Sequence, residues 1–206
     1  ASSINDTPCV LKIEKADPSI DVGNNAYARQ VKFDQWIKKS KYKKHYLNLI
    51  AHGWLYNCKN NTQVPKCATG DKKKYLQSRT KLKTCYYLAY TPVLKYTLNT
   101  ALMNKSYSQY SKIIHTVIKQ LLPVIIELHK ARYNHNDLHT GNIMYDKHWY
   151  IIDYGLVKHK SWKINEDDKR ENKKSNSNDL LSLIDMSIYS PIKVLGFEKG
   201  KFIHKP

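Results

Sequence analysis

The feature that most constrains this chain is the segment of residues 135–155, which reads HNDLHTGNIMYDKHWYIIDYG. Three polar residues stand at set intervals in it: Asp137, then Asn142 in the same loop, then Asp153 behind an apolar stretch. The residues between them indicate a loop, two short strands and a turn that Gly155 allows to be sharp. The pattern therefore predicts a loop–strand–strand–turn unit that presents two carboxylates and one amide.

This spacing is the one at which a phosphoryl-transfer enzyme holds a catalytic carboxylate and two metal ligands. A carboxylate at Asp137, in a loop after a long helix, can orient a substrate hydroxyl and accept its proton. Asn142 offers a neutral oxygen and Asp153 a charged oxygen, and Mg²⁺ prefers oxygen ligands. The cofactors that we expect are therefore ATP and Mg.

Two histidines flank the catalytic-type aspartate. His135 is expected to support the loop by packing and hydrogen bonds rather than by acid–base chemistry. For His139 the sequence leaves two roles open: contact with phosphate or metal, or simply filling the loop.

The rest of the chain predicts an α+β fold. Strands and one helix come first and a more helical half follows, which is typical of a two-lobed arrangement with a ligand site between the lobes. We expect a small strand-rich N-lobe over residues 1–91 and a truncated helical C-lobe over 92–206, with a basic surface insertion at 58–83. The expected strands are 8–15, 50–57, 84–90, 143–145 and 149–152, and the expected helices are 25–39, 106–132 (kinked at Pro123) and 179–188.

Charge is the second unusual property, because the formal net charge is +18. It is concentrated in residues 32–44 and 59–83, where lysines far outnumber acidic residues. Such a surface attracts nucleic acid, acidic protein or anionic membrane, although a lysine-rich solvated surface explains it equally. No stretch is long and apolar enough for a membrane span.

The four cysteines lie at no Cys-x-x-Cys spacing, so we expect reduced thiols rather than a zinc site. Reduced thiols favour an intracellular location, in host cytoplasm or a virion.

Four motifs together resemble those of the eukaryotic-type protein kinase superfamily. VLKIEK resembles the strand with the ATP-binding lysine, HNDLHTGN the catalytic loop, DYG the metal-binding turn, and NDLLSL the Asp-led helix that anchors this loop. VLKIE and DYGL are most similar to the vaccinia-related and casein-kinase-one-like branch, and HNDLHTGNIMY looks like Ser/Thr kinases of large DNA viruses. The last motif is also similar to small-molecule phosphotransferases of the aminoglycoside and choline type. The resemblance covers about residues 8–188.

The resemblance implies a function and roles for individual residues. Lys12 would contact the ATP phosphates, Asp137 would be the catalytic base that receives the proton of a protein hydroxyl, Asn142 and Asp153 would bind Mg, and Asp179 would brace the catalytic loop. It also implies that backbone groups around one expected strand contact adenine, namely those of Tyr87, Leu88, Ala89, Tyr90 and Thr91.

The chain departs from the kinase pattern in several places. The expected helix 25–39 has no glutamate to steady Lys12, and Gln30 stands at that position with Asp34 one turn later as a substitute. Catalysis is therefore expected to be slow or to depend on Glu14. No glycine precedes Lys12 to form a phosphate-binding loop. Asn136 replaces the usual arginine, which argues against control by a phosphorylated activation loop.

The interval between Asp153 and Asp179 has no Ala-Pro-Glu-like segment, so the peptide-docking part of the helical lobe is expected to be largely missing. Three functions stay open: an active Ser/Thr protein kinase, a pseudokinase that serves as a structural or interaction module, and a small-molecule phosphotransferase.

Overall fold

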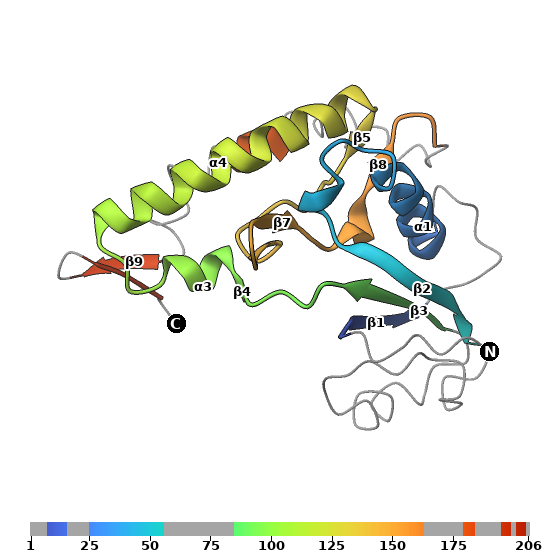
Figure 1. Cartoon of the computed structure of the whole chain (residues 1–206), viewed down its shortest axis with the longest axis horizontal. Coiled ribbons are helices and arrows are strands. Elements are labelled where there is room, and N and C mark those ends of the chain that lie inside the picture. The colour runs from blue at the N-terminus through green and yellow to red at the C-terminus, as the bar shows by residue number, and fades with distance from the viewer. Residues whose placement is uncertain are drawn as a thin grey trace. The chain divides into compact units, whose positions relative to one another are not determined.

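The structure is a computed structural model, which describes residues 8–15, 25–55, 85–162, 179–183, 195–198 and 201–204. These residues form helices and small antiparallel sheets, which confirms the α+β class (Figure 1). The chain divides into two compact units, one of residues 1–40 and 47–93 and the other of residues 41–46 and 94–206. The sequence predicted a boundary at residue 91 and placed residues 41–46 in the first unit, whereas the structure places them in the second.

The first unit is built on a three-stranded antiparallel sheet. Its strands are β1 (Val10–Lys15), β2 (Asn48–Leu55) and β3 (Cys85–Thr91), in the order β1-β3-β2. The central strand β3 is mostly buried, as its apolar sequence predicts. Its register with β1 places Lys12 opposite Leu88 and Glu14 opposite Tyr86.

Helix α1 (Ala26–Ile37) packs against this sheet through β2. Asn25 begins the helix, because its side-chain oxygen accepts hydrogen bonds from the amides of Tyr27 and Ala28. Phe33 and Ile37 are buried, but so are the polar side chains of Gln30 and Asp34. Buried polar groups need hydrogen-bond partners. Gln30 bonds to Tyr86 on β3 and Asp34 bonds to Leu49 on β2, and these contacts position the helix against the sheet.

The second unit contains the longest helix, α4 (Tyr107–Lys130). Ser106 and Gln109 form a capping box at its start, and α4 continues through Pro123 without interruption. An apolar stripe at helical spacing is buried, namely Ile114, Val117, Leu121, Val124, Ile125 and Leu128. A short helix, α3 (Leu98–Leu102), precedes α4 and begins at Thr97, which caps it.

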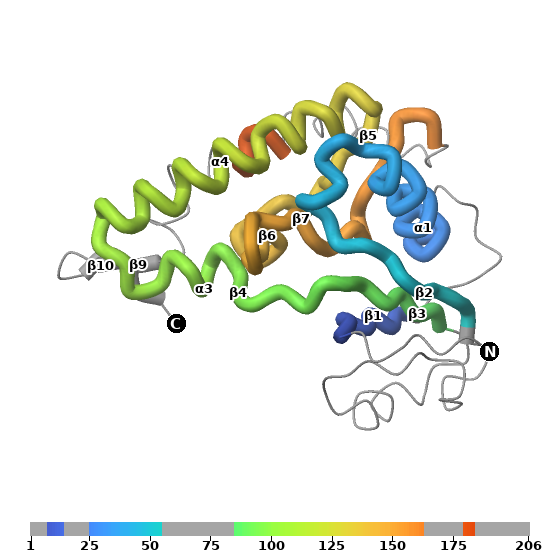
Figure 2. Tube along the Cα trace, in the orientation of Figure 1, coloured from blue at the N-terminus to red at the C-terminus, as the bar shows by residue number. Residues whose placement is uncertain are grey.

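The expected strand pair of the second unit is present as β6 (Ile143–Tyr145) and β7 (Trp149–Ile151), and β4 (Tyr96–Thr97) pairs with β6. Residues 41–46, which contain the short helix η1 (Lys43–His45), run beside β7, and Tyr46 forms a parallel bridge with Ile151 (Figure 2). This bridge explains why residues 41–46 belong to the second unit.

Several short elements were not expected from the sequence. Strand β5 (Tyr133–Asn134) pairs with β8 (Lys158–His159), and β9 (Leu195–Glu198) pairs with β10 (Lys201–His204). Of the helix expected at 179–188, residues 179–183 are helical and the rest lies outside the described residues, as does the basic insertion 58–83. None of the helices in the described ranges is long and apolar enough to cross a membrane.

The cysteines correct one expectation. Cys9 and Cys85 are both disulfide-bonded, so the prediction of reduced thiols is wrong for them. They lie at opposite ends of the β1–β3 pairing, because Val10 is opposite Tyr90 and Lys15 is opposite Cys85. At about 3.3 Å per residue they are about 20 Å apart, too far to be bonded to each other. The argument from free thiols to an intracellular location therefore loses its basis.

Breaking one of these bonds should lower stability measurably. We expect Cys85→Ser to reduce the free energy of unfolding by about 2–4 kcal/mol, because the unfolded chain regains freedom that the bond removes. Urea unfolding without reductant measures this change. A wild-type protein that unfolds at the same urea concentration with and without reductant would contradict the prediction.

Candidate active site

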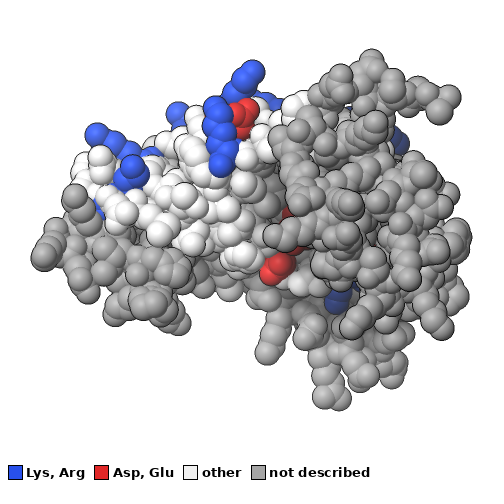
Figure 3. All heavy atoms as spheres, turned by 90° about the horizontal axis from the view of Figure 1, so that it is seen from below, with Lys and Arg blue, Asp and Glu red and all other residues white. Residues whose placement is uncertain are grey.

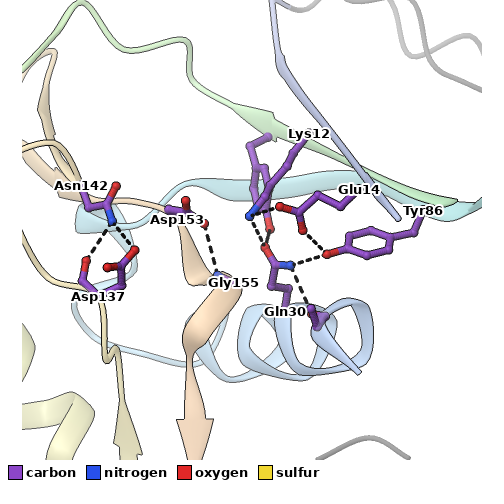
Figure 4. A network of polar contacts seen from close by, with 10 residues as sticks. Lys12, Glu14, Gln30, Tyr86, Asp137, Asn142, Asp153 and Gly155 are labelled. Carbon is purple, nitrogen blue, oxygen red and sulfur yellow. Dashed lines mark hydrogen bonds and ion pairs between the residues drawn. The ribbon is translucent and has the colours of Figure 1, made fainter. Parts of the chain in front are cut away.

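The loop between β5 and β6 holds the catalytic-type aspartate in a defined position. The side-chain nitrogen of Asn142 donates hydrogen bonds to the backbone oxygen of Asp137 (2.8 Å) and to its carboxylate Oδ2 (3.0 Å) (Figure 4). Asn142 is buried, whereas 39% of the Asp137 side chain is exposed. The Asp137 carboxylate is thus held by the buried Asn142, and the remainder of it is accessible to solvent.

Asp153 lies close to Asn142 because β6 and β7 pair. Ile143 is opposite Ile151, and the amide of Ile152 donates to the backbone oxygen of Asn142 (2.9 Å). Asn142 therefore precedes one strand of the pair, and Asp153 follows the other.

The backbone at Asp153 has an unusual conformation, with φ 59° and ψ 79°. A non-glycine residue in this left-handed region is uncommon and persists where its surroundings hold it, frequently at active sites. The Asp153 carboxylate accepts a hydrogen bond from the amide of Gly155 (3.3 Å) at the start of η3 (Tyr154–Leu156).

Asp179 anchors the loop by binding two of its backbone amides. Its carboxylate accepts hydrogen bonds from the amides of His135 (2.7 Å) and Asn136 (3.0 Å) and contacts Nε2 of His129 (3.1 Å). Only 1% of its surface is exposed. Burial alone raises the pKa of Asp179, but the hydrogen bond from His129, the His135 ring and the two amides outweigh it, so the pKa lies below its usual value.

His135 is buried and, like Asp179, helps to hold the loop in place. Its Nε2 lies 2.9 Å from the backbone oxygen of Ile152, and its Nδ1 accepts from the amide of Asp137 (3.3 Å). One ring nitrogen must therefore donate and the other accept, which is the neutral imidazole. Burial lowers the pKa of His135, against the opposing effect of Asp179 and of the hydrogen bond to Ile152.

We expect this burial to make stability depend on pH below neutrality. Burial also lowers the pKa of His45 below the usual 6.5, so near that pH the unfolded chain binds more protons than the native protein. The free energy of unfolding is therefore highest above pH 6.5 and falls as the pH drops toward the lowered native pKa values. The slope is about 1.4 kcal/mol per pH unit for each histidine while only its unfolded form is protonated.

Urea unfolding at several pH values between 7.5 and 5.5 measures this slope. His135→Gln keeps one donor and one acceptor but does not titrate. Its free energy of unfolding should therefore change less steeply with pH, by the contribution of one histidine. Equal slopes for the variant and the wild type would contradict the assignment to His135. Asp179 does not interfere, because its stabilising effect is complete above its unfolded pKa of 3.8 and is lost only below it.

His139 belongs to the turn of the loop. Its Nδ1 accepts from the amide of Gly141 (3.0 Å), and its Nε2 is 4.0 Å from Oδ1 of Asp137. A Cβ atom at Gly141 would lie 2.8 Å from the His139 ring, so glycine is required for this close approach. The side chain is 57% exposed, which places it at the open side of Asp137.

In the first unit, Lys12 has a charged and a neutral partner. Its Nζ is 3.2 Å from Oε1 of Glu14 and 3.5 Å from Oε1 of Gln30 (Figure 4). Gln30 thus reaches Lys12 from the helix as expected. Asp34, the expected substitute, instead accepts from the amide of Leu49 (3.2 Å) and pairs with Lys38 (2.8 Å).

The segment from Tyr87 to Thr91, expected to contact adenine, lies in β3. Because β3 is central, the backbone groups from Tyr87 to Tyr90 are paired with β1 on one side and β2 on the other. Thr91 is past the end of the β1 pairing, and its hydroxyl donates to the backbone oxygen of Pro8 (3.4 Å). Backbone contact with a ligand is therefore more accessible at the Thr91 end.

Two residues of these networks were missed in the sequence. Tyr86 donates to Glu14, and the sequence indicated only that both residues lie on strands, not that these strands pair. His129 pairs with Asp179 across fifty positions of the chain, and no local pattern indicates this contact.

The donor set is compatible with magnesium. The nitrogen of Asn142 donates to Asp137, which leaves the amide oxygen of Asn142 on the other side of the group, and the carboxylate of Asp153 offers two more oxygens of the kind that Mg²⁺ prefers. In the described part of the chain, no three His, Cys, Asp or Glu side chains gather into a metal site. Mg²⁺ does not need such a cage, because one or two carboxylates together with substrate phosphates hold it.

Comparison with known proteins assigns the chain to no family, because no protein-family model and no curated protein matches its sequence.

Proposed function

We propose that this protein is a Mg-ATP-dependent kinase of the Ser/Thr protein kinase type. The observation that carries the proposal is the pair of Asp137 and Asn142, in a loop whose backbone amides are bound by the buried carboxylate of Asp179. A positioned, part-exposed carboxylate beside an oriented amide oxygen is what phosphoryl transfer to a hydroxyl requires.

Each residue has a specific task in this proposal. Asp137 orients the acceptor hydroxyl and takes up its proton, and the two hydrogen bonds from Asn142 hold it in place. Asn142 and Asp153 would hold the metal ion. When bound, this ion would neutralise part of the negative charge of the phosphates. Lys12 binds the phosphates of ATP, and His135 keeps the loop in shape without changing its own charge.

The two compact units support a two-lobed kinase-like arrangement. The first has an antiparallel sheet with the lysine on β1 and one helix against β2. The second has a long helix followed by the loop, the β6–β7 pair and the Asp153 turn. This order of elements along the chain is the order that a small sheet-rich lobe and a larger helical lobe would have.

The surface charge favours an acidic protein as the acceptor. Every lysine of residues 32–44 is exposed, and several lysine and arginine side chains lie along the upper edge of the described part of the face in Figure 3. Such a surface attracts an acidic polypeptide and positions its hydroxyls by long-range attraction, an effect that salt weakens.

Phosphate transfer from labelled ATP to an acidic acceptor protein such as casein tests the proposal. The wild type should transfer phosphate with Mg²⁺, and Asp153→Ala should not. Asp146→Asn is the matched control, because Asp146 lies on the β6–β7 turn, outside the proposed site, and pairs with the exposed Lys95 (3.0 Å). Equal transfer by the wild type and Asp153→Ala would overturn the proposal. Binding of Mg-ATP without any transfer would favour the pseudokinase.

A further inference from the structure

Lys12 belongs to a closed ring of polar contacts, which we call the Lys12 ring: Lys12, Glu14, Tyr86 and Gln30 (Figure 4). Glu14 contacts Lys12 (3.2 Å) and accepts from the Tyr86 hydroxyl. Tyr86 accepts from Nε2 of Gln30 (3.2 Å), and Oε1 of Gln30 accepts from Lys12 (3.5 Å). Each of the four side chains therefore contacts two others.

The direction of every hydrogen bond in the Lys12 ring follows from its chemistry. An ionised carboxylate only accepts, so the Tyr86 hydroxyl must donate to Glu14 and can then accept from Gln30. The nitrogen of Gln30 is thereby directed to Tyr86, and its oxygen to Lys12. Nε2 also donates to the backbone oxygen of Ala26 (3.1 Å), which fixes the amide in this orientation.

Burial makes this orientation strict. Gln30 and Tyr86 are fully buried, whereas the side chains of Lys12 and Glu14 are 22% and 38% exposed. The neutral members thus form the inner side of the ring, and the charged members lie at its solvent side. Burial, followed by the hydrogen bond to Glu14, raises the pKa of Tyr86, so its hydroxyl stays a donor throughout the working range of pH.

We propose that Glu14, held by Tyr86, is the negative partner that positions Lys12 for the phosphates, so that this chain takes the lysine's counter-ion from its own strand and not from helix α1. Glu14 and Tyr86 are positioning residues that act through Lys12. The inference rests on the proposed function, because it concerns how one phosphate-binding residue of that site is held.

The arrangement predicts that a carboxylate is needed on the strand and an amide on the helix, because only an amide at position 30 can donate to both the Tyr86 hydroxyl and the backbone oxygen of Ala26. Gln30→Glu alone gives two carboxylates beside Tyr86 and removes the amide that donates to the backbone oxygen of Ala26. Glu14→Gln alone removes the carboxylate that contacts Nζ of Lys12. In the double variant Glu14→Gln/Gln30→Glu, the negative charge moves to the helix, where the carboxylate faces the backbone oxygen of Ala26 with no donor between them, so the fixed position of Lys12 is not restored.

Steady-state kinetics with labelled ATP and casein test this inference. We expect each single variant to lower kcat about tenfold, because a reacting group loses its fixed position, with a much smaller change in KM for ATP. The double variant should stay about as slow as the single variants, and Tyr86→Phe should lower kcat in the wild-type background without further effect on Glu14→Gln. Asp146→Asn serves as the control with wild-type kinetics.

The outcomes separate the inference from the proposed function. If the wild type transfers phosphate and Glu14→Gln does so equally fast, the inference is wrong and the proposed function stands. If Gln30→Glu is faster than the wild type, the helix is the proper source of the counter-ion and the inference is also wrong. If the wild type transfers no phosphate, the proposed function fails and the inference with it. Thermal unfolding of each variant must show that it is folded at the assay temperature.

Discussion

Replacing Asp137 by asparagine is expected to lower kcat for phosphate transfer by about 10²–10⁴-fold, the usual contribution of a positioned general base. The asparagine oxygen can still accept the hydrogen bond that Asn142 donates to Oδ2, so the loop should keep its shape. The affinity for Mg-ATP should change little, because we assign Asp137 to the acceptor hydroxyl and not to the nucleotide. Casein phosphorylation gives kcat, and calorimetric titration with Mg-ATP gives the dissociation constant.

Asp153→Asn is the informative comparison for this result. It changes a carboxylate of the same unit, but one that we assign to the metal, so it should weaken the binding of Mg-ATP as well as transfer. If Asp137→Asn weakened nucleotide binding as strongly as Asp153→Asn does, Asp137 would be a ligand and not the base.

Replacing Asp179 by alanine should have the largest effect on stability. The change leaves the amides of His135 and Asn136 and the ring of His129 without the buried carboxylate that now accepts from them. Loss of one partner of a buried charged network destabilises proteins by about 3–5 kcal/mol. Urea unfolding measures the change, and transfer activity should fall with it because the catalytic loop loses its anchor.

The matched control for Asp179→Ala is Asp146→Ala. Asp146 also pairs with a basic residue, but Lys95 is 65% exposed. A pair with so exposed a lysine is screened by solvent, so its loss should change stability far less than the loss of Asp179. Similar losses in the two variants would show that the buried contacts of Asp179 do not anchor the loop.

Local patterns in the sequence accounted for the elements that carry the candidate site. The apolar periodicity of residues 106–132 predicted α4 to within two residues at each end, because a buried stripe at helical spacing leaves few alternatives. The strand pair of β6 and β7 followed from two apolar runs around a turn. The spacing of Asn142 and Asp153 is thus a property of one hairpin, within which sequence distance determines distance in space.

Contacts between distant segments could not be predicted in the same way. Asp34 lies one turn from Gln30 on the same side of α1, yet its carboxylate binds the amide of Leu49 on β2. Helical spacing shows which side chains share a face, but the partner depends on which strand lies against each turn. The disulfide bonds of Cys9 and Cys85 depend in the same way on the distances that the folded chain sets.

By itself, the sequence determined which chemical groups this protein has and how they are spaced within a single hairpin or helix: Asp137, Asn142 and Asp153 around β6 and β7, and Lys12 with Glu14 on one face of β1. Only the tertiary structure decided which groups meet across the chain. It brought Asp179 to the loop that contains Asp137, and Tyr86 to Glu14. The physical reason is that a buried carboxylate or hydroxyl takes the donors and acceptors that packing places within about 3 Å of it, and packing is a property of the whole fold.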